Sequence, residues 1–235
     1  MAIVVENECV QDNMYSLSVE YSGSCKMGQF FMLRCWDFDP LLSRPISIYD
    51  FRDGIVKFLY QVMGKGTEKL SKLKAQDVIT LQGPYGNGFP YLDEEDITLV
   101  GGGMGIAPLH YAAKELYRIN PNRHIEIYLG VREENPIIKQ FKDEFPNVKV
   151  NIGGIITEDI EYKKDHVILT CGPEIMMKII SEEGKNQGIT VYTSVEKRMA
   201  CGVGACLGCT CKTTKGNKRA CKDGPVFLGE EILYE

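Results

Sequence analysis

The amino-acid sequence predicts a β barrel plus α/β architecture, in which an antiparallel six-stranded barrel is followed by a doubly wound parallel sheet and a small cysteine-rich C-terminal module. Residues 2–82 hold six short runs of β-branched and aromatic residues between polar turns, as in small antiparallel barrels. Residues 97–194 alternate uninterrupted apolar runs with helical periodicity, which is typical of a parallel sheet covered on both faces. Residues 196–235 lose this periodicity and hold five of the nine cysteines.

The barrel segment is assigned to residues 1–91. Its strands are expected at residues 3–5, 15–21, 30–36, 45–51, 56–63 and 78–81. Turn signals separate them, among them Asn7, Asn13 and the glycine of residues 52–54. One helix is expected over residues 67–73, with Thr67 as its N-cap residue.

The parallel-sheet segment is assigned to residues 92–195, with the boundary near residues 90–96. Its strands are expected at residues 97–100, 125–131, 148–152, 167–170 and 190–194. Its helices are expected after residue 106 and over residues 136–145 and 173–183. Strands and helices that alternate in this way build a doubly wound sheet, because each strand needs a crossover to lie parallel to the last.

Composition and charge exclude several classes of protein. A net charge of −5 with mixed signs argues against a general nucleic-acid binder. No apolar run reaches the roughly 18–20 residues that span a bilayer, and the first residues lack the basic and apolar regions of a secretory signal. We therefore expect no nucleic-acid partner, no membrane contact and a cytoplasmic location.

The strongest motif is a C-x4-C-x2-C run. Cys201, Cys206 and Cys209 form it, and Cys221 follows after a basic loop. Clustering of this kind in a chain without a secretory signal indicates a metal centre rather than disulfides. A segment of this size also buries too little apolar surface to be stable without one. A 2Fe–2S cluster takes four thiolates, two on each iron, which fits this spacing. The alternative, a tetrahedral zinc site, usually takes two C-x2-C pairs, and only one is present.

The fourth ligand of the cluster is expected to be Cys221. The chain can return across residues 212–220 and bring Cys221 to the open iron position. Cys211 is the other candidate, and we expect it to be an ordinary buried thiol. The metal ligands of the expected iron–sulfur module, residues 196–235, are therefore Cys201, Cys206, Cys209 and Cys221.

A glycine-rich loop lies at residues 101–105, between the first apolar strand of the parallel sheet and an amphipathic helix. Such a loop allows a tight turn and lets a pyrophosphate approach the helix N-terminus. It is not a strict G-x-G-x-x-G, so a purely structural turn is the alternative. A glycine–proline turn after a later strand supports a pyridine-nucleotide site, and the expected residues are Gly102, Gly103, Gly105, Gly172 and Pro173. These motifs leave the choice between NAD and NADP open.

Three short motifs of the barrel segment together predict a flavin site. An arginine followed by a serine offers a clamp for a diphosphate and a hydroxyl for the flavin ring, and a glycine–threonine pair opens a helix whose N-terminus holds phosphate. The alternative for each residue taken singly is that the arginine is an ordinary surface charge and the serine an ordinary polar residue of a strand. The expected residues are Arg44, Pro45, Ile46, Ser47, Leu59, Tyr60, Gln61, Gly66 and Thr67.

No catalytic residue is expected in the chain. His110, His124 and His166 stand alone, and no G-x-S-x-G, H-E-x-x-H or Walker motif is present. His110 lies in an expected helix and is assigned a packing or surface role. The chemistry is therefore assigned to cofactors that the chain positions.

The order of the motifs resembles the ferredoxin–NADP reductase superfamily: a barrel with R-P-I-S and G-T, then a sheet with G-G-G-M-G-I-A-P-L and C-G-P. The tail, M-A-C-G-V-G-A-C-L-G-C-T-C followed by A-C-K-D-G-P-V-F, is similar to the electron-transfer subunits of the dihydroorotate dehydrogenase B family. The resemblance covers essentially the whole chain, and the cysteine-rich tail is its most specific part.

The resemblance implies FAD rather than FMN at the barrel motifs, NAD at the second domain, to which it adds Cys171, and a 2Fe–2S cluster at the four cysteines. It implies a partner as well, an FMN-containing subunit that oxidises dihydroorotate to orotate, with two copies of each subunit in a heterotetramer. Electrons would pass from that FMN through the cluster and the FAD to NAD+, because only flavin exchanges both hydride and single electrons. Gln61 stands where an arginine is common in the family, and Cys211 is an additional thiol.

Two other functions fit the same sequence. A related reductase subunit would feed NAD(P)H electrons to ferredoxin or sulfide, because the motifs constrain cofactors more than partners. A zinc-stapled, non-catalytic binding module is the alternative from another class. That module would be colourless, whereas flavin and a 2Fe–2S cluster absorb visible light.

Overall fold

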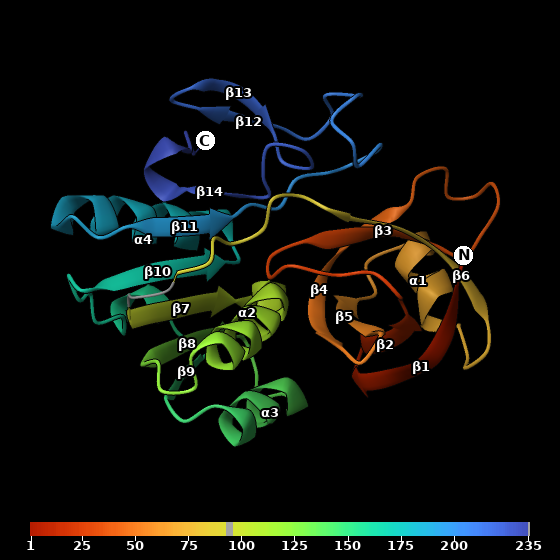
Figure 1. Ribbon diagram of the computed structural model, residues 1–235, viewed down its shortest axis with the longest axis horizontal. Helices are drawn as coiled ribbons and strands as arrows, with labels where there is room; N and C mark the ends of the chain where they lie inside the picture. Colours follow the sequence, from red (N-terminus) through yellow and green to blue (C-terminus); the bar gives the residue numbers. More distant parts are fainter. Residues whose placement is uncertain (93–95, 235) are drawn as a thin grey trace.

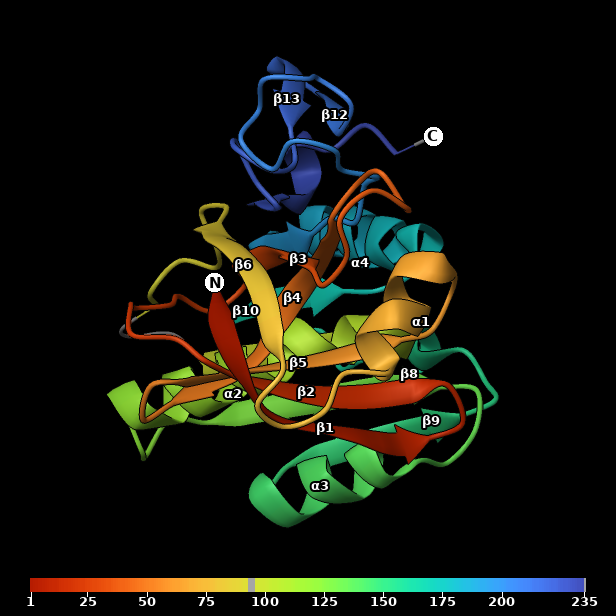
Figure 2. The ribbon, with the colours of Figure 1, turned by 90° about the vertical axis from the view of Figure 1, so that its right-hand side faces the viewer.

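The computed structural model describes residues 1–92 and 96–234, and it confirms the expected architecture (Figure 1). The barrel strands are β1 (Ala2–Gln11), β2 (Met14–Glu20), β3 (Phe30–Arg34), β4 (Arg44–Arg52), β5 (Ile55–Gln61) and β6 (Val78–Tyr85). They pair antiparallel and close in the order β1-β2-β5-β4-β3-β6. A second sheet lies beside the barrel, and the cysteine-rich C-terminal segment lies over both in the two views (Figures 1 and 2).

Two local expectations for the barrel segment were wrong. Asn7 lies inside β1 rather than in a turn, and its amide donates to the carbonyl oxygens of Leu70 and Leu73 at 3.0 and 2.9 Å. The helix α1 (Lys65–Ser71) starts before Thr67, which occupies its third position. The Thr67 hydroxyl oxygen accepts the N–H of the N-cap glycine at 3.2 Å, so this threonine caps the helix from inside it.

The second sheet is doubly wound. Its elements are β7 (Asp96–Gly102), α2 (Ile106–Ile119), β8 (Ile125–Val131), α3 (Pro136–Glu144), β9 (Val148–Ile152), β10 (His166–Cys171), α4 (Glu174–Gln187) and β11 (Val191–Ser194). The parallel strands run in the order β11-β10-β7-β8-β9. Helices α2 and α3 pack on one face with Leu99 and Ile127, and α4 packs on the other with Val100 and Tyr128. None of the helices in the described residues is long and apolar enough to cross a membrane.

The edge of this sheet is completed from the C-terminal segment. A short strand, β14 (Val226–Leu228), pairs antiparallel with β11 and covers an edge whose backbone groups would otherwise be unpaired. Part of residues 196–235 therefore belongs structurally to the sheet. The limits assigned to the three segments remain predictions, and the boundary near residues 90–96 includes residues 93–95, which lie outside the described part of the chain.

The barrel and the sheet meet between β4 and α2. His110 of α2 is fully buried, and its ring stacks on Tyr49 of β4 with the ring centres 4.1 Å apart. The ring nitrogens of His110 lie 3.1 Å from the Tyr49 carbonyl oxygen and 3.0 Å from Glu144 Oε2. Lys114 and Asp50 form an ion pair at 2.6 Å across the same interface. His110 is thus a packing residue that fixes how the two domains sit.

The contact with His110 makes the Glu144 carboxyl a source of pH-dependent stability. Its hydrogen bond with His110 is the largest cause that lowers the pKa of Glu144 from 4.5 to about 2. A carboxyl whose folded pKa is depressed adds stability above its unfolded pKa, and this stability is lost as the pH falls from 4.5 toward 2. We expect Glu144→Gln to lower the unfolding free energy at neutral pH and to flatten its decline over that acid range, as measured by urea unfolding. Asp143→Asn, an exposed carboxylate on the same helix, is the control. If the unfolding free energy of Glu144→Gln fell with acid pH as steeply as that of the wild type, this account would be contradicted.

The C-terminal segment folds around a short hairpin that the sequence did not predict. Its strands are β12 (Thr210–Thr213) and β13 (Gly216–Arg219). The cysteine loop before the hairpin lies against the barrel. Gly202 has a φ of 72°, and a Cβ on it would lie 3.0 Å from Met32 of β3 and 2.9 Å from Tyr85 of β6. The close approach of this glycine seats the cysteine loop on the barrel.

Candidate functional site

Four cysteine sulfurs gather where the hairpin begins and ends. Cys209 precedes β12 and Cys221 follows β13, and the register of the hairpin brings their sulfurs to 3.2 Å. Cys201 and Cys206 form a second pair in the preceding loop, where the Cys206 N–H donates to the Cys201 sulfur at 3.5 Å. The Gly204 N–H donates to the Cys221 sulfur at 3.1 Å and so connects this loop to the first pair.

Each of the four sulfurs accepts at least one backbone N–H. The donor–sulfur distances run from 3.1 to 3.5 Å, and the donors are Gly204, Cys206, Gly208 and Cys221. Such donors favour the thiolate, and the N–H of Cys206 is the largest cause of a Cys201 pKa lowered to about 6. Burial acts in the opposite direction on Cys221 and raises its pKa to about 12. A loop of donors aimed at four sulfurs fits a cluster that carries negative charge.

The distances between the four sulfurs distinguish a tetrahedral zinc site from a 2Fe–2S cluster. A single tetrahedral zinc ion with Zn–S bonds of about 2.3 Å needs four sulfurs roughly 3.8 Å apart. Within residues 1–92 and 96–234, no three cysteine sulfurs lie within 4.8 Å of one another. Two pairs of sulfurs therefore suit two irons with two thiolates each better than one zinc ion. The assignment of the four ligands remains a proposal.

Cys211 occupies a different environment from the two pairs. It lies in β12 and is buried, its thiol donates to the Cys209 carbonyl oxygen at 3.7 Å, and burial raises its pKa. Cys211 lines the cavity on the nucleotide side of the hairpin, whereas Cys209 and Cys221 do not. The geometry favours Cys221 over Cys211 as the fourth ligand.

A cavity of about 500 Å³ lies where the loops after β7 and β10 meet. The strand order of the sheet reverses between these two strands, which is the place where doubly wound sheets bind ligands. The lining includes all the sequence-assigned nucleotide residues except Cys171, namely Gly102, Gly103, Gly105, Gly172 and Pro173. Cys171 is buried at the end of β10, directly before two of the lining residues.

The roof of this cavity comes from the C-terminal segment, which sequence reasoning did not connect with it. Thr210 and Asn217 of the hairpin and Tyr234 near the chain end line it. The Tyr234 hydroxyl oxygen lies 3.1 Å from Ser181 Oγ of α4 and donates to Thr193 Oγ1 of β11 at 3.4 Å, so this segment is held against the sheet and its helix. No local motif marks these residues, because they reach the cavity only through the tertiary fold.

The glycines of the nucleotide loops have two different roles. A Cβ on Gly105 would lie 2.2 Å from the Cys171 carbonyl oxygen, and one on Gly102 would lie 2.7 Å from Pro173 Cδ. These two glycines let the loops after β7 and β10 pack against each other. Gly103 has a φ of 53° and open space around it. Among the three, Gly103 is therefore the position where a pyrophosphate has room to approach the backbone.

The structure brings Arg44 of β4 to the first turn of α1. A Cβ on Gly66 would lie 2.4 Å from Arg44 Nε, so the guanidinium occupies the space that glycine leaves open here. The guanidinium also lies 5.6 Å from the centre of the Trp36 ring and donates to the Leu42 carbonyl oxygen at 2.6 Å. In the part of the chain that the structure describes, Arg44 pairs with no carboxylate. A half-buried arginine beside a helix start fits a bound diphosphate.

The other residues assigned to the flavin fall into two groups. Half-buried residues continue β4 beyond Arg44, namely Pro45, Ile46 and Ser47. Leu59 and Tyr60 are buried in β5, and Gln61 is exposed at its end. The Tyr60 hydroxyl donates to Asn7 at 3.3 Å, and burial raises its pKa, so this side chain is engaged within the barrel. The hydroxyl of Thr67 is used in capping α1, which leaves its backbone N–H for a phosphate.

One strand separates the flavin motif from the cysteine pairs. Pro45 of β4 lies opposite Met32 of β3. Met32 packs in one apolar cluster with Cys209 and Cys221. The barrel strand that carries the R-P-I-S motif is thus next to the strand on which the cysteine loop is seated.

The barrel, the cavity where the strand order reverses, and the cysteine loop together define the class of the protein. It is a reductase of the ferredoxin–NADP reductase fold with an added cysteine-rich module. Solved structures share this fold. A ferredoxin NADP+ reductase from Neisseria gonorrhoeae with bound FAD and NADP matches with a TM-score of 0.65 and 16% identity, over 80% of this chain and 90% of that one. A chain from the structure of an NADH-dependent reduced ferredoxin-NADP oxidoreductase matches with a TM-score of 0.88 and 26% identity, over 100% of this chain and 90% of that one.

Proteins of similar sequence identify the family to which this reductase belongs. Residues 196–233 match the family model of the iron–sulfur cluster binding domain of dihydroorotate dehydrogenase B. The dihydroorotate dehydrogenase B (NAD(+)) electron transfer subunit of Clostridium acetobutylicum is 44% identical over 98% of this chain and 95% of its own length. The subunit of the same name from Clostridium perfringens is 40% identical over 98% of this chain and 96% of its own length. The chain belongs to this family of electron transfer subunits.

Proposed function

We propose that this chain carries electrons between a dihydroorotate-oxidising partner subunit and NAD+, with FAD and a 2Fe–2S cluster as its cofactors. The partner contains FMN, and the net reaction is dihydroorotate plus NAD+ giving orotate, NADH and a proton. Two copies of each subunit form a heterotetramer, located in the cytoplasm. Bound flavin exchanges either a hydride or single electrons, which is the chemistry needed between a nicotinamide and an iron–sulfur cluster.

One observation carries the proposal: the loop that holds four N–H-supported sulfurs packs on β3, beside the strand that presents Arg44. An electron conduit needs its centres close together and rigidly held. The packing of Met32 against Cys209 and Cys221 provides this for the cluster and the flavin. The nucleotide cavity is roofed by the same hairpin, which keeps the nicotinamide site close to the cysteine loop.

Each part of the site has a task that its residues can perform. Arg44 binds the diphosphate of the flavin nucleotide, and Gly66 gives the guanidinium its room. The backbone N–H groups around Cys201 and Cys221 stabilise the negative charge of the thiolates. The open backbone at Gly103 accepts the pyrophosphate of NAD, while the packing behind it keeps the cavity in shape.

The cysteine loop also presents apolar side chains for a partner. Leu207 lies between two proposed ligands, is 62% exposed and has a φ of 59°. A left-handed leucine costs roughly 1–2 kcal/mol, and here it gains no burial within the chain. Val203 in the same loop is 51% exposed. Contact with the catalytic subunit, which must come close to the cluster to deliver electrons, accounts for both.

A second candidate function is electron delivery to ferredoxin. It is favoured by the full-length likeness to a chain of the NADH-dependent reduced ferredoxin-NADP oxidoreductase structure, with a TM-score of 0.88 and 26% identity. The identity of 44% to a dihydroorotate dehydrogenase B subunit over almost the whole chain favours dihydroorotate as the electron source.

Reconstitution with the catalytic subunit of the same genome tests the proposed function. The two chains are co-expressed under anaerobic conditions, and orotate and NADH are measured together. We expect equal amounts of both products from the complex, and none from either chain alone. A colourless chain that holds zinc, or a coloured one that reduces ferredoxin but never binds the catalytic subunit, would overturn the proposal.

The same assay includes Leu207→Gly. Glycine relaxes the left-handed backbone and removes the exposed side chain, so iron content and NADH-dependent dye reduction should be unchanged. Affinity for the catalytic subunit should fall by about tenfold or more, since a buried leucine contributes roughly 1.5–3 kcal/mol.

A further inference from the structure

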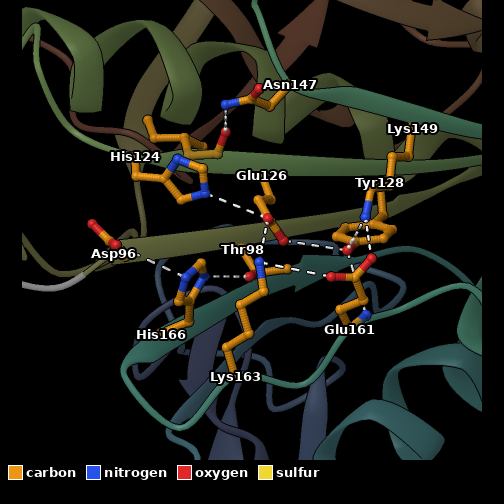
Figure 3. A network of polar contacts seen from close by, with 11 residues as sticks. Asp96, Thr98, His124, Glu126, Tyr128, Asn147, Lys149, Glu161, Lys163 and His166 are labelled. Atoms are coloured by element: carbon orange, nitrogen blue, oxygen red, sulfur yellow. Dashed lines mark hydrogen bonds and ion pairs between the residues drawn. The ribbon is translucent and has the colours of Figure 1, made fainter.

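A group of potential metal ligands lies at the amino ends of two parallel strands, whereas the nucleotide cavity lies at the carboxyl ends. Asp96 is the first residue of β7 and His166 the first of β10, and the two are paired across the strands. Asp165 directly precedes His166. The nucleotide cavity lies at the carboxyl ends of these strands, so the group at their amino ends is a separate place in the fold. Figure 3 shows two of its members, Asp96 and His166.

The geometry of this group suits a metal ion. One potential ligand atom from each of Asp96, Asp165 and His166 lies within 4.8 Å of the other two. The His166 side chain is only 3% exposed, and its Nε2 lies 3.9 Å from Asp96 Oδ2, which is too far for a hydrogen bond. A buried imidazole thus lies beside two carboxylates, and its Nε2 is separated from Asp96 by a gap that a bound cation would bridge.

The other ring nitrogen of His166 is held by Thr98. The Thr98 hydroxyl oxygen lies 2.9 Å from His166 Nδ1, and Thr98 is buried on β7 (Figure 3). When this hydroxyl accepts the Nδ1 proton, Nε2 keeps its lone pair on the side of Asp96. A metal-binding histidine is usually supported by such a hydrogen bond on its second nitrogen.

The nearby basic side chains pair with Glu126 rather than with the two aspartates, and the His124 ring packs edge-on against the His166 ring with the centres 5.7 Å apart. Lys163 pairs with Glu126 at 2.5 Å, and His124 Nε2 faces the same carboxylate at 3.4 Å (Figure 3). In residues 1–92 and 96–234, the Asp165 carboxylate forms no hydrogen bond or ion pair. Two carboxylates therefore face one imidazole without a lysine or arginine between them.

We propose that Asp96, Asp165 and His166 bind a divalent transition-metal ion of the zinc class, with water completing its coordination. An imidazole ligand favours zinc-class ions over Mg²⁺ and Ca²⁺, which take oxygen ligands. Two carboxylates and a neutral imidazole balance the charge of a divalent ion. The ion links the start of β7 to the segment before β10, and Thr98 is the positioning residue for His166.

Zinc binding to the holoprotein tests this site. The protein, with its cluster shown intact by visible absorption, is freed of loosely bound metal with EDTA and titrated with Zn²⁺ by calorimetry. We expect a zinc ion at this site in the wild type, located by an anomalous X-ray peak between the three side chains. Asp165→Asn changes an exposed residue and should fold normally, and it is expected to weaken binding about tenfold or more. Thr98→Val should weaken it by about 10–100-fold.

Glu161→Gln is the matched control, because Glu161 belongs to the same network and pairs with Lys149 and Lys163 instead of joining the ligand group. It should bind zinc as the wild type does, and zinc should raise the melting temperature of both but not that of Asp165→Asn. Equal binding by Asp165→Asn and the wild type overturns the proposal, as does zinc found only at the cysteines. Absence of zinc binding by the wild type overturns it as well.

Discussion

Replacing Cys221 by serine is expected to remove the 2Fe–2S cluster and, with it, electron transfer between dihydroorotate and NAD+. The change leaves one iron without its second thiolate. Loss of a ligand costs at least as much as loss of the hydrogen-bonded support around it, so dihydroorotate-dependent NAD+ reduction should fall by about 100-fold or more. The measurement is NADH formation by the reconstituted complex, with iron and acid-labile sulfide determined on the same sample.

Cys211→Ser is the matched control, since it removes a neighbouring buried thiol that lines the nucleotide cavity. It should keep its iron, its sulfide and its activity. NADH oxidation by an artificial dye should persist in Cys221→Ser, because that reaction needs only the flavin and the nucleotide site. A cluster lost from Cys211→Ser and retained in Cys221→Ser would transfer the role of fourth ligand to Cys211.

The sequence predicted the cluster loop and favoured Cys221 over Cys211 as the fourth ligand, but the spacing of the cysteines did not exclude Cys211. Residues two apart on a strand point to the same side, so the position of Cys211 after Cys209 does not exclude it. The choice comes from the hairpin, whose register returns Cys221 to 3.2 Å from Cys209. The hairpin strands are rich in lysine, threonine and glycine, which give a weak strand signal, and the sequence therefore did not reveal them.

The barrel and the parallel sheet were predictable because their strands carry their own apolar patterns. The errors fall on polar residues whose roles depend on distant partners. Asn7 looks like a turn residue, but its side chain reaches a carbonyl oxygen 63 positions away in α1. Thr67 looks like an N-cap, but the chain reaches the helix three residues earlier, with Gly64 in the capping position. Local preference gave way to tertiary contacts in both cases.

The candidate site shows the same division between local and long-range information. Glycine and cysteine motifs are local, and they predicted residues that lie together in the cavity and in the cysteine loop. The roof of the cavity is long-range, because Tyr234 reaches it only after β14 has returned the chain to the sheet. The seat of the cysteine loop on Met32 is likewise invisible in the sequence. These two contacts are what bring the three cofactor sites together.

Adding one methyl group to Gly105 is expected to damage the nucleotide site. A Cβ there would lie 2.2 Å from the Cys171 carbonyl oxygen, which is backbone and cannot rotate away. Overpacking of this kind costs about 1–3 kcal/mol, so Gly105→Ala should lower the unfolding free energy by that amount. NADH binding should weaken by about tenfold or more, because the two loops that form the cavity must separate. The φ of Gly105 is −63°, which alanine adopts freely, so the effect is steric alone.

Gly64→Ala is the control for this substitution. Gly64 has an extended backbone with a φ of 173°, and no heavy atom lies within 4 Å of an added Cβ. Its KM for NADH in dye reduction should not change, and its stability should fall by no more than about 1 kcal/mol, the cost of alanine at a helix N-cap position. In Gly105→Ala the FAD and iron contents should match the wild type, so that a raised KM for NADH traces to the nucleotide loops. An unchanged KM together with unchanged stability would mean that the packing between these loops does not shape the cavity, and the open backbone at Gly103 would then hold the pyrophosphate without it.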